Sequence, residues 1–305
     1  MQASRGSLWT WTLCGLSVCL LFAPWGSTRG EENGKLRIVV FGAHPDDAEI
    51  RAGGTAALWA KHGHEVELVS VTNGDIGHYA MSRPALAARR LAEAKAADKL
   101  LGAATRVLDI HDGELEPTLA NRRTITRVIR EWKADIVIAH RPNDYHPDHR
   151  YVGVLVQDSA YMVTVPKFCP ETPHLRGNPV FLHSEDGFQR PNPFRPDIVV
   201  AIDDVIDQKV EALMKMESQF VEGGANGSPP KDAADREARR KRGFVAFKNR
   251  FAWTADHHRK KLIELYGEEL GKKVRYAEAF EICEYGRYPN AEELRRLFPF
   301  FSKNK

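Results

Sequence analysis

The feature that most constrains this chain is an alternation of short apolar runs with helical patterns between residues 35 and 163. The apolar runs, rich in Val and Ile, predict strands buried on both faces. They are LRIVVFGA at 36–43, EVELVSVT at 65–72, RVLDI at 106–110 and ADIVIAH at 134–140, with helices predicted over 48–62, 82–101, 120–132 and 149–163. Strands separated by helices form βαβ units. We therefore expect a Rossmann-like α/β fold with a largely parallel sheet flanked by helices.

The second half of the chain is less regular. Residues 165–196 contain many prolines, and a loop of this length in a compact domain is usually a lid or binding loop. A strand at 197–202, a helix at 203–220, a connector at 222–232 and a late strand within 275–286 follow. No repeat or composition break appears, so we expect one domain over 31–305, with 165–196 as a lid at the active site.

The first thirty residues differ from the rest. An early arginine precedes an apolar run from about residue 8 to 22, with no acid and no lysine. This pattern predicts a secretory signal peptide over 1–30 and export to the periplasm or the extracellular space. An uncleaved membrane anchor is the alternative, but the run is short for a span of about 20 residues. We expect no membrane span in the mature protein.

Charge and cysteine content exclude other classes of protein. The formal net charge is +3, and because Arg5 and Arg29 lie in the leader, the remainder carries +1. This balance gives no support for nucleic-acid binding. Cys169 and Cys283 are the two cysteines after the leader, and neither has a CxxC neighbour. One disulfide is possible, but a thiolate zinc site is not expected. Homo-oligomers are possible.

Polar side chains follow each of the first four predicted strands. The first is followed by HPDD at 44–47, the second by TNGDIGH at 72–78, the third by His111 and Asp112, and the fourth by HRPNDYHPDH at 140–149. In open α/β sheets, ligands bind beyond the carboxyl ends of the strands. We therefore expect these four loops to meet at one end of the sheet.

The first and fourth loops together predict a metal site. Two imidazoles and a carboxylate with an open fourth position make a catalytic zinc site, and both loops supply His and Asp. Each residue alone has a simpler explanation, since a histidine can occupy a turn and Asp46, Asp47 or Asp148 can cap a helix. Capping does not require histidine, so the pairing of the two motifs favours zinc.

The paired motifs resemble a known family. AHPDD at 43–47 and HPDH at 146–149 are similar to the PIG-L/LmbE-like zinc-dependent N-deacetylases, which include N-acetylglucosaminyl-phosphatidylinositol de-N-acetylase. The similarity extends over about 35–153, with an Arg-x-x-Glu helix at Arg90 and Glu93 and a DGEL segment at 112–115. Beyond about residue 165 no specific match is evident, so the resemblance does not transfer substrate specificity.

The resemblance implies a role for each site residue. His44, Asp47 and His149 would bind zinc, Asp46 would be the general base, and a protonated His146, oriented by Asp148, would stabilise the tetrahedral intermediate. Arg90 would support the site, and we group it with Asp75 and Asp112 as substrate-binding residues. For Asp75 and His78 a glycine-rich turn is the alternative. The mycothiol deacetylase pattern has a tyrosine where this chain has Asp144, so an oxyanion role for tyrosine does not carry over.

The expected function is therefore zinc-dependent hydrolysis of an N-acetyl group on an N-acetylglucosamine-type sugar or glycoconjugate. The metal hydrolase follows from the residues, and the sugar follows from the resemblance. Two alternatives remain: a zinc hydrolase of a non-sugar amide or ester, and a glycan-binding module without turnover. The first strand does not lead into GxGxxG, so a dinucleotide site is poorly supported.

Overall fold

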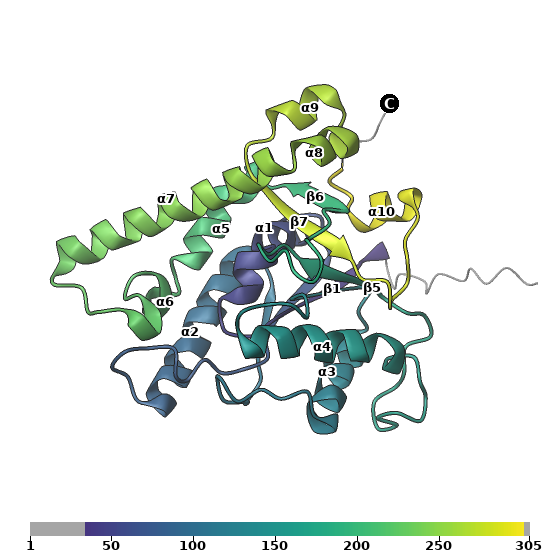
Figure 1. Cartoon of the computed structure of the whole chain (residues 1–305), viewed down its shortest axis with the longest axis horizontal. Helices are drawn as coiled ribbons and strands as arrows, with labels where there is room; N and C mark the ends of the chain where they lie inside the picture. The colour runs from purple at the N-terminus through teal and green to yellow at the C-terminus, as the bar shows by residue number, and fades with distance from the viewer. Residues whose placement is uncertain (1–33, 302–305) are drawn as a thin grey trace, which may run out of the picture. The chain divides into compact units, whose positions relative to one another are not determined.

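A central sheet with helices on both faces organises the computed structural model, which describes residues 34–301 (Figure 1). The strands are β1 (Arg37–Gly42), β2 (Glu65–Ser70), β3 (Ala104–Val107), β4 (Ile136–Ala139), β5 (Val180–Ser184), β6 (Ile198–Ala201) and β7 (Ala277–Ile282). The first-half helices are α1 (Asp47–Lys61), α2 (Arg83–Leu101), α3 (Leu119–Trp132) and α4 (Pro147–Met162). The later helices are η2 (Asp203–Val205), α5 (Ile206–Leu213), α6 (Glu217–Phe220), η3 (Gly224–Asn226), α7 (Ala233–His257), α8 (Arg259–Tyr266), α9 (Glu268–Lys273) and α10 (Ala291–Leu297).

The sheet has seven strands in the order β3-β2-β1-β4-β5-β7-β6. Strands β1 to β5 pair with one another in parallel. Strand β7 pairs antiparallel with both β5 and β6. The predicted Rossmann-like, largely parallel α/β fold is confirmed. Strand order reverses beside β1, because β2 and β3 lie on one side of it and β4 and β5 on the other.

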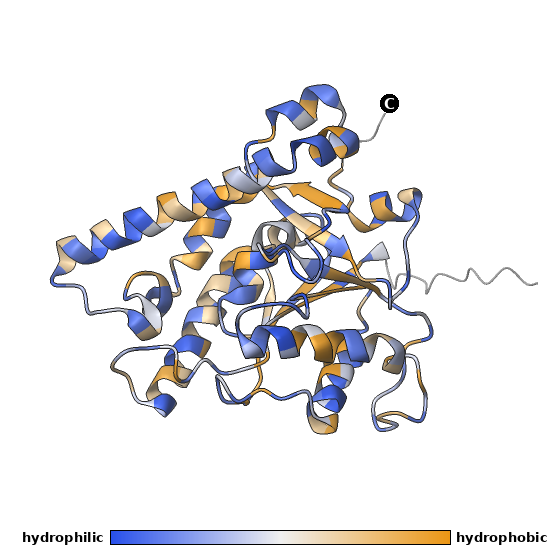
Figure 2. Ribbon diagram, in the orientation of Figure 1, coloured by the Kyte–Doolittle hydropathy of each residue, from blue (hydrophilic) through white to orange (hydrophobic). Residues whose placement is uncertain are grey.

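Alternating strand residues divide the core into two layers. In β1, Ile38 and Val40 pack with α1, α2, α5 and α7, whereas Val39 and Phe41 pack with α3 and α4. Both sets are buried because helices cover both faces of the sheet, which is why these strands read as continuous apolar runs. Figure 2 shows the strands in hydrophobic colours and most helices with one hydrophobic and one hydrophilic side.

Two predictions for the second half need correction. Residues 165–196 are not one continuous loop, because Val180–Ser184 form β5, a buried strand between β4 and β7. The predicted helix at 203–220 is divided into η2, α5 and α6. Leu213, Met214 and Met216 are all buried. Helices α8, α9 and α10 were not predicted from the sequence.

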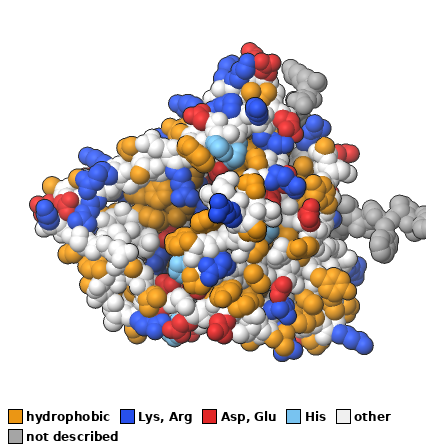
Figure 3. Space-filling view, in the orientation of Figure 1, with side chains coloured by type: hydrophobic (Ala, Val, Ile, Leu, Met, Phe, Trp, Pro, Cys, Tyr) orange, Lys and Arg blue, Asp and Glu red, His pale blue; other side chains and the backbone are white. Residues whose placement is uncertain are grey.

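Other expectations concern cysteines, membranes and charge. Cys169 and Cys283 are both buried and free. Among the described helices, none combines the length and the apolar character needed to cross a bilayer. On the face drawn in Figure 3, acidic and basic side chains are interspersed and form no continuous basic patch. The predicted signal peptide at 1–30 lies outside the described residues.

A buried carboxyl pair lies between α1 and α2. Burial raises the pKa of Asp98 to about 6, although contacts with Glu49 and Thr105 act in the opposite direction. Burial and the neighbouring Asp98 raise the pKa of Glu49 well above its usual range. Both side chains are almost fully buried, so two adjacent charges are costly there. The folded state is therefore most stable when one of the two carboxyl groups is protonated.

This pair predicts a pH-dependent loss of stability. Because the folded-state pKa values are raised, the folded state binds the proton more tightly, and the stabilisation present below about pH 4 is lost as pH rises through about 6. Asp98→Asn removes one of the two charges. Its free energy of unfolding should fall less than that of the wild type between pH 5 and 8, by about 1–3 kcal/mol. Chemical denaturation at both pH values checks this, and parallel pH profiles would contradict it.

Candidate metal and catalytic site

The candidate site lies beyond the carboxyl ends of β1 and β4, where the strand order reverses. This is the position at which open α/β sheets bind ligands. The loop after β1 carries His44 to Asp47, and the loop after β4 carries His140 to His149. Strands β1 and β4 pair directly, which brings these two distant sequence motifs together. The predicted convergence of the motifs is therefore confirmed.

Backbone contacts fix the carboxylate of Asp47. Its Oδ2 accepts hydrogen bonds from the backbone N–H of Ala43 at 3.0 Å and of His44 at 2.8 Å. Gly42 permits this close turn, because a Cβ there would lie 2.6 Å from Cβ of Asp47. Burial opposes ionisation, but the nearby His149 and His140 hold the pKa of Asp47 well below its usual range. Asp47 is therefore an ionised, immobile acceptor.

Three side-chain atoms form a nearly equilateral triangle. His44 Nδ1 lies 3.3 Å from Asp47 Oδ2, His149 Nε2 lies 3.4 Å from the same oxygen, and the two nitrogens are 3.3 Å apart. Tetrahedral zinc with bonds of about 2.0–2.1 Å separates its ligand atoms by about 3.3–3.4 Å. The three predicted ligands thus form one face of a tetrahedron of the right size, and their donor set of two imidazoles and a carboxylate fits zinc.

Carboxylates lie behind both candidate histidine ligands. His44 Nε2 is 3.1 Å from Asp112 Oδ1 and 3.2 Å from Asp148 Oδ2. His149 Nδ1 is 3.1 Å from Asp144 Oδ1. Metal-binding histidines commonly donate their second N–H to a carboxylate, which orients the ring and fixes its tautomer. Each histidine therefore presents the nitrogen that belongs to the triangle.

Two of these neighbours were not anticipated from the sequence. Asp144 was noted only as a departure from a family pattern, yet it backs His149. His140 stacks on His149 with ring centroids 4.4 Å apart, and its Nε2 accepts a hydrogen bond from the N–H of Ala43 at 3.3 Å. Burial lowers the pKa of His140 to about 4, so the ring is neutral. Its position as the last residue of the predicted fourth strand was the available signal.

Asp46 is separate from the triangle and is held by Arg90. Nη2 of Arg90 donates to Asp46 Oδ2 at 3.1 Å and to the carbonyl of Pro45 at 2.9 Å. Asp46 begins α1 without a side-chain capping bond, so capping does not explain it. Burial raises the pKa of Asp46 to about 6, while the Arg90 charge lowers it and Asp47 raises it. A carboxylate with this pKa is suited to accept a proton near neutral pH.

The loop after β2 wraps around Arg90. Gly74 has a φ of 67°, and a Cβ at Gly77 would lie 2.5 Å from Nη1 of Arg90. In the same loop, Asp75 accepts from the N–H of Asp112 at 3.1 Å and contacts His111 at 2.6 Å. Asp75 therefore ties the loop after β2 to the loop after β3.

His146 caps α4 with its own ring. Nδ1 accepts a hydrogen bond from the N–H of Asp148 at 3.2 Å. Burial lowers the pKa of His146, and so do the charges of His44 and His149. The favoured state is a neutral ring with its hydrogen on Nε2. This differs from the predicted protonated His146. The Asp148 carboxylate contacts His44 and the N–H of Gly113 instead of orienting His146.

Sequence comparisons are consistent with this arrangement. The family model for PIG-L, described as GlcNAc-PI de-N-acetylase, matches residues 39–160. Diacetylchitobiose deacetylase from Thermococcus kodakarensis is 32% identical over 192 residues, which cover 61% of this chain and 71% of that protein. The chain belongs to the PIG-L family.

The relatives of this PIG-L chain differ in their activities. A 4-oxalmesaconate hydratase from Pseudomonas putida is 29% identical over 196 residues, covering 59% of this chain and 73% of that protein. The solved N,N'-diacetylchitobiose deacetylase from Pyrococcus horikoshii has a TM-score of 0.60 and 25% identity, covering 81% of this chain and 84% of the other. The LmbE-like fold is thereby confirmed, and relatives include both deacetylases and a hydratase.

The three predicted substrate-binding residues of this PIG-L chain have structural tasks. Arg90 is buried against Asp46 and Pro45, Asp112 backs His44, and Asp75 joins two loops. These contacts within the protein give each of the three residues a supporting role, and their contact with substrate remains a prediction. A charged residue near the end of a strand can support the site as easily as it can bind a ligand, and the sequence does not distinguish these roles.

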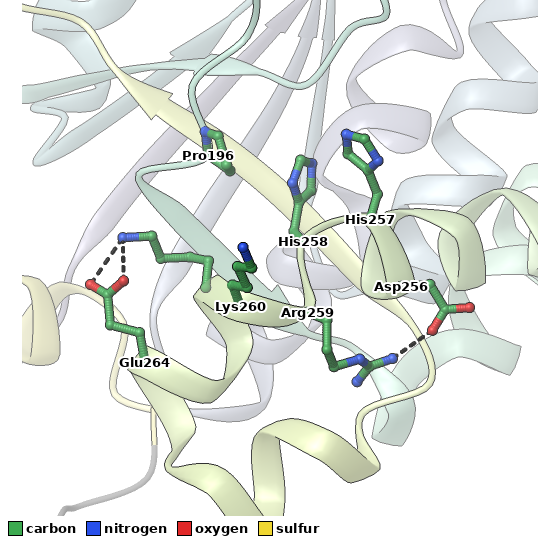
Figure 4. A pocket seen from close by; sticks show the side chains of 8 residues that line it. Pro196, Asp256, His257, His258, Arg259, Lys260 and Glu264 are labelled. Carbon is green, nitrogen blue, oxygen red and sulfur yellow. Dashed lines mark hydrogen bonds and ion pairs between the residues drawn. The ribbon is translucent and has the colours of Figure 1, made fainter.

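A separate open cavity of about 520 Å³ lies at the junction of α7 and α8 (Figure 4). His257, His258 and Lys260 line it, and its wall includes none of the metal-site residues. Much of its charge is already paired: Arg259 contacts Asp256 at 2.7 Å, and His258 contacts Glu185 at 2.6 Å. The candidate functional site is therefore the triangle and not this cavity.

The contact behind His149 yields a prediction for metal affinity. Asp144→Asn keeps the shape of the side chain but removes the negative charge that lies 3.1 Å from His149 Nδ1. We expect zinc affinity to fall about tenfold, within the range typical of such outer contacts. Competition with a chromophoric chelator measures it, with the exposed Asp204→Asn as the matched control. Equal affinities in the two variants would show that Asp144 does not support the ligand.

Proposed function

We propose that this chain is a zinc-dependent N-deacetylase that hydrolyses the N-acetyl group of an N-acetylglucosamine-type sugar or glycoconjugate. The observation that carries the proposal is the triangle of His44, Asp47 and His149, whose 3.3–3.4 Å edges match a tetrahedral zinc site. When bound, zinc supplies a Lewis acid that polarises a carbonyl and makes water acidic near neutral pH.

Asp46 is the proposed proton acceptor. It lies beside Asp47 in sequence, yet its carboxylate is paired with Arg90 rather than with the histidines. Burial raises its pKa to about 6, so near pH 7 the carboxylate is ionised but still basic. It would take a proton from the attacking water and transfer it to the departing amine nitrogen. Protonation makes the amine a better leaving group.

His146 is the proposed hydrogen-bond donor to the developing oxyanion. Because Nδ1 accepts the Asp148 N–H, the neutral ring carries its hydrogen on Nε2. The rings of His44 and His146 meet edge to face, with centroids 4.7 Å apart, so His146 borders the triangle. A donor fixed before reaction stabilises charge that forms in the transition state, by about 2.7–4 kcal/mol in comparable sites.

The sugar substrate is supported by relatives. The matching family model and the deacetylase from Thermococcus kodakarensis both carry names of N-acetyl sugar deacetylases. We place the activity outside the cytoplasm, because residues 1–30 have the pattern of a signal peptide. Glycans and cell-wall fragments are the substrates that such a location would offer.

Metal analysis combined with an acetate-release screen tests the proposal. We expect about one zinc per chain and acetate release from N-acetylglucosamine or diacetylchitobiose, with none from His149→Ala. Cleavage of non-sugar amides alone would favour the alternative hydrolase, and sugar binding without turnover in zinc-loaded protein would favour a glycan-binding module. The hydratase relative makes water addition to an unsaturated dicarboxylate a necessary negative control.

A further inference from the structure

Two arginines, Arg51 on α1 and Arg250 on α7, lie beside the candidate site. The ammonium of Lys209 on α5 donates to the carbonyl of Ile50 at 2.7 Å and lies 3.5 Å from the ring centre of Phe251. One ammonium therefore touches both α1 and α7. The next residue on α1 is Arg51, and the preceding residue on α7 is Arg250. Lys209 thus links the segments that carry the two arginines, although 199 positions of sequence separate them.

Both arginines are close to the proposed reaction centre. Arg51 lies one helical turn after Asp47, and residues four apart share a helix face. Its Nη1 donates to the backbone carbonyl of Glu185, just beyond β5 at the carboxyl edge of the sheet. Arg250 lies one turn before Thr254, whose hydroxyl contacts the Glu185 carboxylate at 2.8 Å. The α1 and α7 segments that carry the two arginines therefore both contact Glu185.

Neither guanidinium has an ion pair with a described carboxylate. Arg51 contacts a carbonyl oxygen, and Arg250 remains open to solvent. The side-chain carboxylates of Glu185, which supplies this carbonyl, and of the next residue, Asp186, have other partners. Glu185 contacts Thr254 and His258, and Asp186 lies 3.5 Å from Nε of Arg141.

The positive charges of Arg51 and Arg250 oppose each other. Partial burial and the charge of Arg51 lower the pKa of Arg250, while the charges of Glu185 and Asp47 act to raise it. Two adjacent cations without an anion between them are unfavourable, and a bound anion would relieve their repulsion.

We propose that Arg51 and Arg250 form an anion subsite that binds a carboxylate or phosphate group on the substrate, next to its N-acetyl group. A guanidinium offers paired N–H donors that match both groups. The inference rests on the proposed function and narrows it: the preferred substrate is an acidic N-acetyl amino sugar or conjugate. Arg51 and Arg250 are specificity-determining residues in this proposal and take no part in proton transfer.

Calorimetric titration of the zinc-loaded full chain carrying Asp46→Asn tests this, since slow turnover permits binding measurements. The probes are N-acetylglucosamine, which is neutral, N-acetylglucosamine 6-phosphate and N-acetylmuramic acid, which carries a carboxylate. We expect at least one acidic probe to bind about tenfold more tightly than the neutral one. Adding Arg250→Gln or Arg51→Gln should remove most of that preference, and raising the salt concentration should weaken it.

Arg242→Gln, on the same helix and exposed, is the matched control and should keep the preference. Arg250→Lys retains one charge and should keep part of it. Equal affinity for all three probes would overturn the subsite, as would a preference that survives both Arg→Gln changes, because the anion would then contact another group. Acetate release without an acidic preference would reject the subsite alone. An arginine-dependent preference without any deacetylation would reject the proposed function alone.

Discussion

Replacing Asp46 by asparagine should leave zinc content near the wild-type value and lower kcat by about 10²–10⁴-fold, the usual contribution of a positioned proton acceptor. The amide oxygen can still accept the Arg90 hydrogen bond at 3.1 Å, so the local geometry persists. What is lost is the ability to bind a proton. Metal analysis and steady-state rates of acetate release, measured on the same protein preparation, check both halves of the prediction.

The exposed Asp204→Asn is the matched control for Asp46→Asn and should keep both zinc and activity. Near-normal turnover in Asp46→Asn would remove Asp46 from the base role. Loss of zinc would make Asp46 a metal ligand in place of, or together with, Asp47. The prediction therefore distinguishes the two adjacent carboxylates, which the structure holds with different partners: backbone N–H groups for Asp47 and Arg90 for Asp46.

Removing a corner of the triangle should have a different signature. In His149→Ala, zinc loses one of three protein ligands, and we expect sub-stoichiometric metal and a fall in kcat/KM of about 10³-fold or more, since the metal supplies several kcal/mol of transition-state stabilisation. Asp47→Ala should behave in the same way, because its Oδ2 lies within 3.4 Å of both histidine nitrogens. Zinc content and acetate release report the two effects together.

Added zinc should partly restore His149→Ala if weaker affinity is the cause, and it should not restore Asp46→Asn. The exposed His174→Ala serves as a control for general effects of removing an imidazole. Full zinc occupancy in His149→Ala, with activity retained, would exclude His149 from the metal site. Dialysis of the wild type against a chelator should reproduce the loss of activity and be reversed by zinc.

The sequence was sufficient for the parts of the fold that local pattern determines. Apolar runs rich in Val and Ile predicted β1, β2 and β4, and the helix predicted over 82–101 is α2. It also predicted the meeting of HPDD and HPDH, because the ends of parallel strands share one edge of the sheet. These inferences depend on period and chain order, which a sequence contains.

Tertiary structure decided what each polar side chain contacts. Asp75, Asp112 and Arg90, which we expect to bind substrate, also support loops and ligands. The sequence did not indicate these contacts, since burial and partners depend on segments far apart in the chain. The strand β5 was hidden among prolines, and its pairing with β4 reveals it.

The sequence by itself determined the α/β architecture and the two motifs that converge, because hydrophobic periodicity and the order of elements along the chain can be read from the sequence. Only the tertiary structure showed that three donor atoms lie 3.3–3.4 Å apart, that Asp144 backs His149, and that Lys209 links the segments carrying Arg51 and Arg250. Distances between side chains of remote segments are set by packing of the whole domain, and the chain order does not encode them residue by residue.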